Sequence, residues 1–421
     1  MNIRSSLIVT LCLSFSFSAH AQEWTRFRGP NGDGINRNVD IPVKWTDKDY
    51  AWKVNLPGEG IGSPVLWGQK LFIIAADQEA MKRMILCIDA QNGKTLWSRR
   101  FDFKTHKKHK VNTYATGTCA VEANRVYFTW GQPESYLLFA FDHEGNEVWE
   151  RKFGKYKSGH GYGVSPTIVD DLVVLPNDQG VNSSIIAVNK TNGKTVWETP
   201  RETKRASYST PCVFTSKDGR KKQIIVTDWH HGISGLDASS GKVLWEHNVF
   251  GRPHPERAIA SPIVNGDTII GTCGFTTLNK HCIVIRPAWT GSTDDAKIAW
   301  KTDRSVPHCP TVLVVGDRLY LWNDLGIVSC LNAANGKVIY KERVPDQRGK
   351  FYCSPVCAGK NIFCFSEFGT VGVIATGDQF KVLGTFELED EIIRSTPALA
   401  NGNMYLRTLD KLFCIKGARI Q

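Results

Sequence analysis

The sequence lacks any apolar run long enough to cross a membrane. Its longest apolar stretch, from Leu7 to about Phe17, is shorter than the ~20 residues that a spanning helix needs. The stretch follows one early basic residue and precedes Ala19-His20-Ala21, a small-x-small cleavage site. We therefore expect residues 1–21 to be a secretory signal peptide, and residues 22–421 to be exported without a transmembrane segment.

Paired cysteines are also missing, although the chain has 12 Cys. No two are adjacent or separated by two residues, which excludes a Cys-x-x-Cys zinc site and a Cys-x-x-Cys-His haem attachment. Most lie within apolar stretches, where a thiol acts as a small buried side chain. The odd number after residue 21 does not indicate a disulfide framework, although one bridge, for example between Cys273 and Cys282, stays open.

Acidic residues are outnumbered, with 41 Asp+Glu against 52 Lys+Arg and a formal net charge of +11. Acidic surfaces and polymers are therefore suitable partners, whereas export disfavours nucleic acid. We interpret the basic runs His106–Lys110 and Arg220–Lys222 as solvated loops.

One kind of turn recurs along the chain. In Asp89-Ala90-Gln91-Asn92-Gly93, and in similar segments further on, an Asp or Asn precedes a Gly, and an aromatic residue such as Trp97 follows the Gly by four positions. The Asp or Asn side chain caps the turn and the Gly supplies a positive φ. Apolar strands flank each turn, so the pattern predicts hairpins.

A second pattern precedes each hairpin: a small residue, usually followed by Pro, opens a short strand. The openings recur at spacings of 42 to 55 residues, enough for four strands each. We predict an all-β fold, an eight-bladed β-propeller of four-stranded blades. The openings are Ser63-Pro64, Thr118-Cys119, Ser165-Pro166, Thr210-Pro211, Ser261-Pro262, Cys309-Pro310, Ser354-Pro355 and Thr396-Pro397.

The last repeat is one strand short, and an N-terminal strand near residues 50–56 has the matching pattern. We expect this strand to complete the last blade and close the ring, giving a single domain over residues 22–421. The fifth repeat departs from the pattern through a charged insertion between Arg286 and Trp300. Aromatic residues expected to dock neighbouring blades are Trp52, Trp97, Trp149, Trp197, Trp245, Trp300 and Tyr340.

The repeated Asp-x-x-x-Gly-x-x-x-Trp turn, with the opening segment Trp24–Gly34, resembles the pyrroloquinoline quinone (PQQ) repeat family of exported propellers. That family includes quinone-dependent dehydrogenases and propellers that bind no cofactor. In the dehydrogenases, Ca²⁺ holds PQQ beside a catalytic Asp, an adjacent Cys-Cys pair and a Trp flank the quinone, and long insertions roof the site. This sequence has neither a Cys-Cys pair nor a long insertion.

The resemblance nevertheless nominates residues for such a site. Asp178 or Asp324 could serve as the base, Trp229 as the floor, and Asn177, Asp178, Asn323 and Asp324 as oxygen ligands for Ca²⁺.

In a propeller, the loops that enter the innermost strands and those that join the second and third strands open on one face, where function is usually found. These loops carry rings, donors and acceptors suited to an anionic, planar or sugar-like ligand. Our rim candidates are His160, Tyr162, Tyr208, Trp229, His230, His231, Arg257, His308, Tyr352, Glu367 and Arg394.

Three functions follow from these patterns. The first is a non-catalytic, monomeric binding or scaffold propeller of the periplasm or cell envelope, similar in general form to the propeller subunit of the outer-membrane β-barrel assembly machine. It would bind no cofactor and would contact an envelope protein. The second is an alcohol or sugar oxidoreductase that uses PQQ with Ca²⁺. The third is recognition of an acidic polysaccharide.

Overall fold

The computed structural model describes residues 23–203, 205–250, 258–274, 280–388 and 391–420. Apart from two 3-10 turns, η1 Asp47–Asp49 and η2 Thr293–Asp295, the regular structure is entirely β. None of the helices in these ranges is long and apolar enough to span a membrane. The expected signal peptide lies outside the described residues and stays a prediction.

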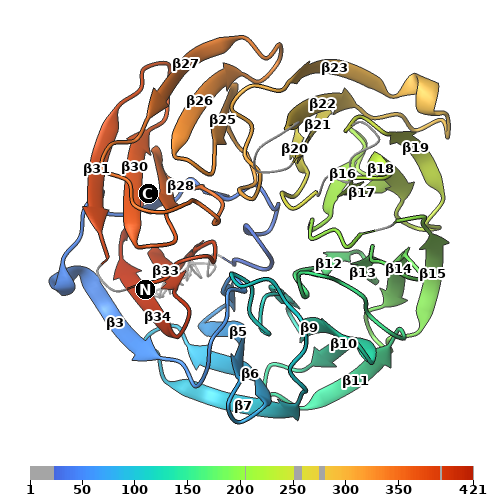
Figure 1. Ribbon diagram of the computed structural model, residues 1–421, viewed down its shortest axis with the longest axis horizontal. Coiled ribbons are helices and arrows are strands. Elements are labelled where there is room, and N and C mark those ends of the chain that lie inside the picture. The colour runs from blue at the N-terminus through green and yellow to red at the C-terminus, as the bar shows by residue number, and fades with distance from the viewer. Residues whose placement is uncertain (1–22, 204, 251–257, 275–279, 389–390, 421) are drawn as a thin grey trace, which may run out of the picture.

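Eight four-stranded blades are arranged in a ring, and the chain passes through them in sequence order (Figure 1). This confirms the predicted all-β, eight-bladed propeller. Each blade is an antiparallel meander, because strands adjacent in sequence are also adjacent in the sheet. The first seven blades, each from inner to outer strand, are blade 1, β4 Val65–Trp67, β5 Lys70–Asp77, β6 Lys82–Asp89 and β7 Thr95–Asp102; blade 2, β8 Ala120–Glu122, β9 Arg125–Gln132, β10 Ser135–Phe141 and β11 Glu147–Lys152; blade 3, β12 Thr167–Val169, β13 Leu172–Asn177, β14 Ser184–Asn189 and β15 Thr195–Pro200; blade 4, β16 Cys212–Thr215, β17 Lys222–Asp228, β18 Gly232–Asp237 and β19 Val243–His247; blade 5, β20 Ile263–Asn265, β21 Thr268–Cys273, β22 His281–Arg286 and β23 Lys297–Thr302; blade 6, β24 Leu313–Val315, β25 Arg318–Trp322, β26 Ile327–Asn332 and β27 Val338–Arg343; and blade 7, β28 Val356–Ala358, β29 Asn361–Phe365, β30 Thr370–Ala375 and β31 Val382–Glu387.

The eighth blade joins the two ends of the chain. Its inner strands are β32 Ala398–Ala400, β33 Asn403–Arg407 and β34 Lys411–Lys416, and its outer strand is β3 Tyr50–Asn55. β3 pairs with β34 in antiparallel register, and Figure 1 shows the blue β3 beside the red C-terminal strands. The predicted closure by an N-terminal outer strand is therefore confirmed.

The segment before β3 crosses the channel and ties the inner strands together. Trp24 bridges to Leu66 of blade 1, and the Thr25 carbonyl accepts a hydrogen bond from the amide of Val121 in blade 2. Further along, β1 Ile35–Asn36 pairs in parallel with β28, and β2 Val39–Asp40 pairs with β35 Ala418–Arg419. We call residues 24–40 the channel plug.

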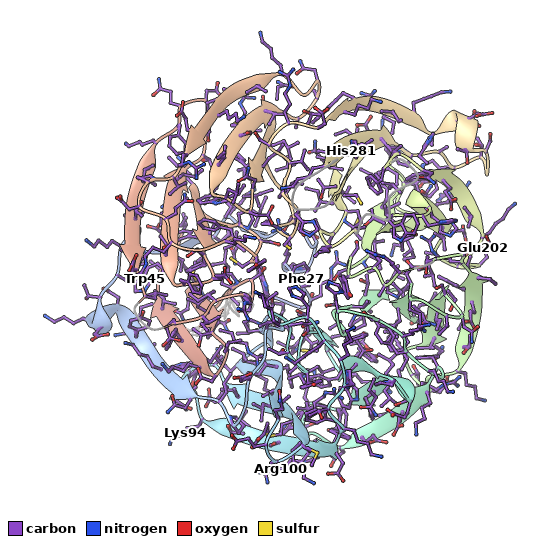
Figure 2. The ribbon with its side chains drawn as sticks, in the orientation of Figure 1. Phe27, Trp45, Lys94, Arg100, Glu202 and His281 are labelled. Atoms are coloured by element: carbon purple, nitrogen blue, oxygen red, sulfur yellow. The ribbon has the colours of Figure 1, made fainter. Side chains whose placement is uncertain are left out.

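Two buried arginines fix the centre of the plug. Arg26 donates to the carbonyl of Pro211 at 2.8 Å, while Arg28 donates to the carbonyls of Pro355 at 2.8 Å and Val312 at 2.9 Å. Arg28 is fully buried, and this burial lowers the pKa of its guanidinium to about 10. The two side chains therefore anchor the plug to blade 4 and to blades 6 and 7, and Phe27, between them in sequence, lies near the centre of the ring (Figure 2).

The aromatic residues of the outer strands reach into the turn of the next blade. The indole N–H groups of Trp52, Trp97, Trp149, Trp197 and Trp300 each donate to a carbonyl in that turn at 2.9 to 3.1 Å. The turn glycine is needed where the ring lies against it: a Cβ on Gly93 would come within 2.8 Å of Trp52.

Blades 4 and 6 use other contacts. The Trp245 indole donates to Gln223 of its own blade at 2.7 Å, and Tyr340 packs against Phe380 of blade 7 with ring centroids 5.5 Å apart.

A ring of hydroxyls surrounds the channel just before the inner strands. In seven of the eight steps, the backbone N–H of one blade's Ser or Thr donates to the hydroxyl of the next blade at 2.9 to 3.0 Å. We call this set the hydroxyl ring. Its members are Ser63, Thr118, Ser165, Thr210, Ser261, Thr311, Ser354 and Thr396.

The hydroxyl ring corrects one boundary of the sequence pattern. In blade 6 the position is filled by Thr311, which accepts from the amide of Ser261 and donates its own amide to Ser354. The blade therefore opens at Thr311, two residues after the predicted Cys309-Pro310. The prediction relied on Pro310, but in this blade the residue that follows the ring hydroxyl of Thr311 is Val312 and not a Pro.

The cysteines of the described segments form no disulfide with one another, and all but Cys309 are buried. Cys273 and Cys282 form no bridge. Burial in the β-sheets raises the pKa of most of these thiols, for example Cys282 to about 12. Such thiols act as small core side chains.

Candidate functional site

A cavity of about 490 Å³ opens at the end of the channel where the chain enters the inner strands. All eight hydroxyl-ring residues line it, so every blade contributes. Phe27 of the plug also lines the cavity. Arg26 and Arg28 bind the carbonyls of Pro211 and Pro355, each one residue further along its strand than the ring hydroxyl, so the plug closes the cavity below the ring.

The charge of the cavity is one-sided. Lys110, Lys350 and Arg394 line it, together with the imidazoles of His109, His160 and His308, and no Asp or Glu is among its described lining residues. Cationic groups held around a concave site of low dielectric concentrate anions there. The wall therefore suits a ligand with negative charge.

Two of the imidazoles form a parallel pair. The rings of His109 and His160 are 5.0 Å apart between centroids, with planes 4° apart. Their loops are joined directly, because the His109 amide donates to the His160 carbonyl at 3.2 Å. Asn112 reinforces the junction by donating its amide to the same carbonyl at 2.7 Å and to that of Tyr162 at 3.0 Å. Blades 1 to 3 thus hold this side of the mouth in one geometry.

Arg394 lies beside the His109 loop and comes from the loop that enters blade 8. It donates to the carbonyl of Val111 at 3.1 Å and lies 3.5 Å from the carboxylate of Glu367. Its Nε is buried and has no hydrogen-bond partner among the described residues. A buried donor without an acceptor costs about 1–3 kcal/mol.

Several predicted rim residues line the cavity and others do not. Those that line it all come from loops that enter inner strands. Trp229, His230, His231 and Glu367, which come from loops between second and third strands, are outside its lining. Arg257 lies outside the described residues. The rim candidates that line the cavity are His160, Tyr162, Tyr208, His308, Tyr352 and Arg394.

The Trp229 group is used within blade 4 instead. Trp229 is buried in the core and contacts His230 edge-on. His231 contacts Glu246 at 2.9 Å through Nδ1 and accepts the amide of Glu202 at 3.1 Å through Nε2. The side chains of Trp229, His230 and His231 therefore pack within the protein and do not line the cavity.

Asp178, nominated as a base, belongs to a buried ion cluster. Arg201 contacts its carboxylate at 2.9 Å and also contacts the carboxylate of Asp228. Burial raises the pKa of Asp178, and the guanidinium opposes this shift. The carboxylate does not line the cavity.

The other nominated oxygens are also engaged. The Asp324 carboxylate accepts the amides of His308 at 2.8 Å and Cys309 at 3.1 Å, and lies 3.2 Å from the ammonium of Lys280. Asn323 accepts two backbone amides of its own turn, and Asn177 accepts from Gln179 at 2.7 Å.

The sequence reasoning missed several lining residues, four of which matter for the chemistry of the cavity. Lys110 was assigned to a solvated loop, Asn112 and Lys350 were not singled out, and Phe27 was noted only as part of the opening segment. The available signal was position, since Lys110, Asn112 and Lys350 stand in loops that enter inner strands.

Comparisons with known proteins agree with this architecture. The family model described as outer membrane protein assembly factor BamB matches residues 81–286. The solved structure of BamB from Moraxella catarrhalis superposes with a TM-score of 0.63 at 14% identity, covering 87% of this chain and 99% of that one. Together these matches support a PQQ-like β-propeller family for this chain.

Quinoproteins share the same fold. A quinohemoprotein alcohol dehydrogenase from Comamonas testosteroni superposes on this chain with a TM-score of 0.62 at 13% identity, covering 95% of this chain and 82% of that one. A quinoprotein ethanol dehydrogenase of Pseudomonas aeruginosa is 23% identical over 201 residues, 45% of this chain but only 29% of the relative. At these identities the structural likeness shows the fold alone.

The Ca²⁺-bound PQQ of the dehydrogenases does not fit the described side chains. The four oxygen-bearing candidates are engaged as above, and no group of three or more His, Cys, Asp or Glu within the described ranges is placed to hold a metal ion. Among the described lining residues, no carboxylate is present to act as calcium ligand or base.

Proposed function

We propose that this PQQ-like propeller is a non-catalytic binding module of the periplasm or cell envelope, and that its channel-mouth cavity receives the anionic group of its ligand. The observation that carries the proposal is the one-sided charge of the wall, with Lys110, Lys350, Arg394 and three imidazoles but no described carboxylate. The envelope location is supported by the expected signal peptide and by the match to a family named for outer membrane assembly.

The hydroxyl ring supports the same ligand chemistry. Seven of its oxygens already accept an amide proton from the preceding blade. Each hydroxyl keeps its own proton, which it can donate to an acceptor in the cavity. A carboxylate or phosphate would thus meet cations at the mouth and O–H donors deeper in, either as a small molecule or as an acidic segment of a partner protein.

Titration calorimetry of residues 22–421 tests the proposal. The probes are citrate, inorganic phosphate, an Asp/Glu-rich peptide, and PQQ with and without Ca²⁺. We expect binding by at least one anionic probe that weakens about tenfold in the Lys110→Gln/Lys350→Gln variant, because two charge-assisted contacts are lost. Lys107→Gln/Lys341→Gln, with two exposed lysines outside the cavity, is the matched control.

Binding that is equally weakened by both variants, or no binding by any anionic probe, would refute the anionic site. Dye-linked oxidation of an alcohol or sugar after addition of PQQ and Ca²⁺ would refute the non-catalytic role.

A further inference from the structure

Two connections depart from the regular turn lengths of the ring, and they lie in neighbouring blades. The first and second strands are joined by two residues in seven blades, but β16 and β17 of blade 4 are joined by six, residues 216–221. In blades 1 to 4, 6 and 7 the third and fourth strands are joined by five or six residues, whereas β22 and β23 of blade 5 are joined by ten, residues 287–296.

Both long connections lie at the end of the ring opposite the channel-mouth cavity. Thr210 precedes β16 and lines that cavity, while Ser216 follows β16. In an antiparallel meander, the turn between the first and second strands and the turn between the third and fourth strands lie at the same end. The connections of blades 4 and 5 therefore meet on the opposite face.

The insertion in blade 5 is firmly anchored. Gln223 of blade 4 accepts the Trp245 indole and donates to the carbonyl of Ala288 at 2.6 Å, replacing the docking contact made elsewhere in the ring. Trp289 stacks on Phe214 of blade 4, with centroids 5.5 Å apart and planes at 26°. The insertion thus has a defined shape and presents a partly buried Trp at the blade boundary.

The extended turn of blade 4 is closed on itself. The Ser216 amide donates to the Lys221 carbonyl at 2.9 Å, and the Ser216 hydroxyl donates to Asp218 at 2.5 Å. The Asp218 carboxylate also accepts the Arg220 amide at 3.1 Å, and these hydrogen bonds, that from Ser216 first, lower its pKa. Hydrogen bonds within the turn therefore fix the Asp218 carboxylate, while the side chains of Lys217 and Lys221 are exposed to solvent.

Together the two connections enclose a groove of about 600 Å³. Phe214 and Trp289 form its aromatic part, and Lys217, Lys221 and Arg286 supply three positive charges against the two carboxylates of Asp218 and Asp267. Asp267 lies 3.6 Å from Arg286, while Lys217 and Lys221 make no ion pair among the described residues.

This combination matches an acidic sugar better than a membrane. The flat apolar face of a pyranose ring packs against an indole, and uronate or sulfate groups pair with lysine and arginine. Membrane insertion would require protruding apolar side chains, but no residue lining the groove is among the exposed large hydrophobic side chains of the described chain. Its aromatic rings lie within the groove.

We propose that this groove between blades 4 and 5 binds an acidic polysaccharide chain, with Trp289 under a sugar ring and Lys217, Lys221 and Arg286 along its anionic groups. The site is separate from the channel-mouth cavity and would fix the propeller to a polymer while leaving the cavity open.

Retention on immobilised heparin and polygalacturonate, followed by calorimetry with their oligomers, tests the groove. We expect salt-sensitive binding that falls at least tenfold in Lys217→Gln/Lys221→Gln and severalfold in Trp289→Phe, with no retention on neutral dextran. Lys110→Gln/Lys350→Gln at the opposite end is the matched control and should bind the polymers normally. The groove variants should in turn bind citrate and phosphate as the unchanged protein does, which separates the two sites.

The inference is wrong if both double variants lose polymer binding equally, if only the cavity variant loses it, or if the protein binds neither polymer. It is also wrong if vesicles of phosphatidylglycerol, but not the oligomers, compete through Lys217 and Lys221. Since the charge variants change only exposed side chains, thermal unfolding at the unchanged midpoint confirms that they fold.

Discussion

Replacing Arg28 by Met tests whether the channel plug holds the ring together. The substitution keeps an apolar stem but removes the donors to Pro355, Val312 and the Asp33 carbonyl, all at 2.8 to 2.9 Å. Hydrogen bonds to charged groups contribute about 1.5–3 kcal/mol each. Part of this loss is offset because the guanidinium no longer has to be buried, and because water can bind the carbonyls that lose their donor. We expect a net destabilisation of about 3–5 kcal/mol.

The expected change in melting temperature follows from the size of the ring. An unfolding entropy of about 2.1 cal/mol/K per residue gives roughly 0.8 kcal/mol/K for about 400 residues. The midpoint should therefore fall by about 4–6 °C in differential scanning calorimetry. Arg37→Met, in the same segment but exposed, should change the stability by less than about 0.5 kcal/mol. Equal midpoints for the two variants would show that the plug does not brace the ring.

Two further predictions concern the blades. Thr311→Val keeps the side-chain shape but strands the buried amide of Ser261, so urea unfolding should show a loss of about 1–3 kcal/mol, and a loss no larger than that of an exposed Thr→Val change would contradict the role of the hydroxyl ring. For Glu246, burial opposes ionisation, but the hydrogen bond and charge of His231 outweigh it and lower the carboxyl pKa. Its folded-state pKa lies below the unfolded value, so its stabilisation is present above about pH 4.5 and is lost as pH falls further. Glu246→Gln should thus be less stable than the unchanged protein at pH 6, and urea titrations at pH 3 should show the difference closing; a constant gap would contradict this assignment.

The blades could be predicted because their signals are local. An Asp or Asn, a Gly and an aromatic residue within nine positions define a hairpin, and their repetition defines the ring. Even the closing strand was visible, since Trp52 carries the outer-strand pattern without a hairpin before it. The opening of blade 6 was predicted at the wrong residue because the sequence has a Pro at position 310, as the pattern requires. The residue that completes the hydroxyl ring there is the one whose hydroxyl and amide reach Ser261 and Ser354.

The plug could not be predicted, because nothing near Arg26 and Arg28 in the sequence shows that their acceptors lie in blades almost 200 to more than 300 residues away. The site was predicted in part for a related reason. Loops that enter inner strands converge on the axis, so His160 and Tyr208 lie where expected from the repeat. Loops between second and third strands start further out, and whether a side chain such as Trp229 reaches the axis depends on loop packing.

The plug also constrains the order in which the protein assembles. Its partners include Leu66 near the start of the ring and Pro355 near its end, so the docking surface for residues 24–40 is complete only when the late blades have formed. The plug is synthesised before the blades but can reach its native position only after the late blades have formed, and contacts of such long sequence separation slow folding. Until then the ring stays open between its first and last blades. A bulky fusion placed just before Trp24 would consequently delay the final step of folding more than the same fusion placed after residue 420.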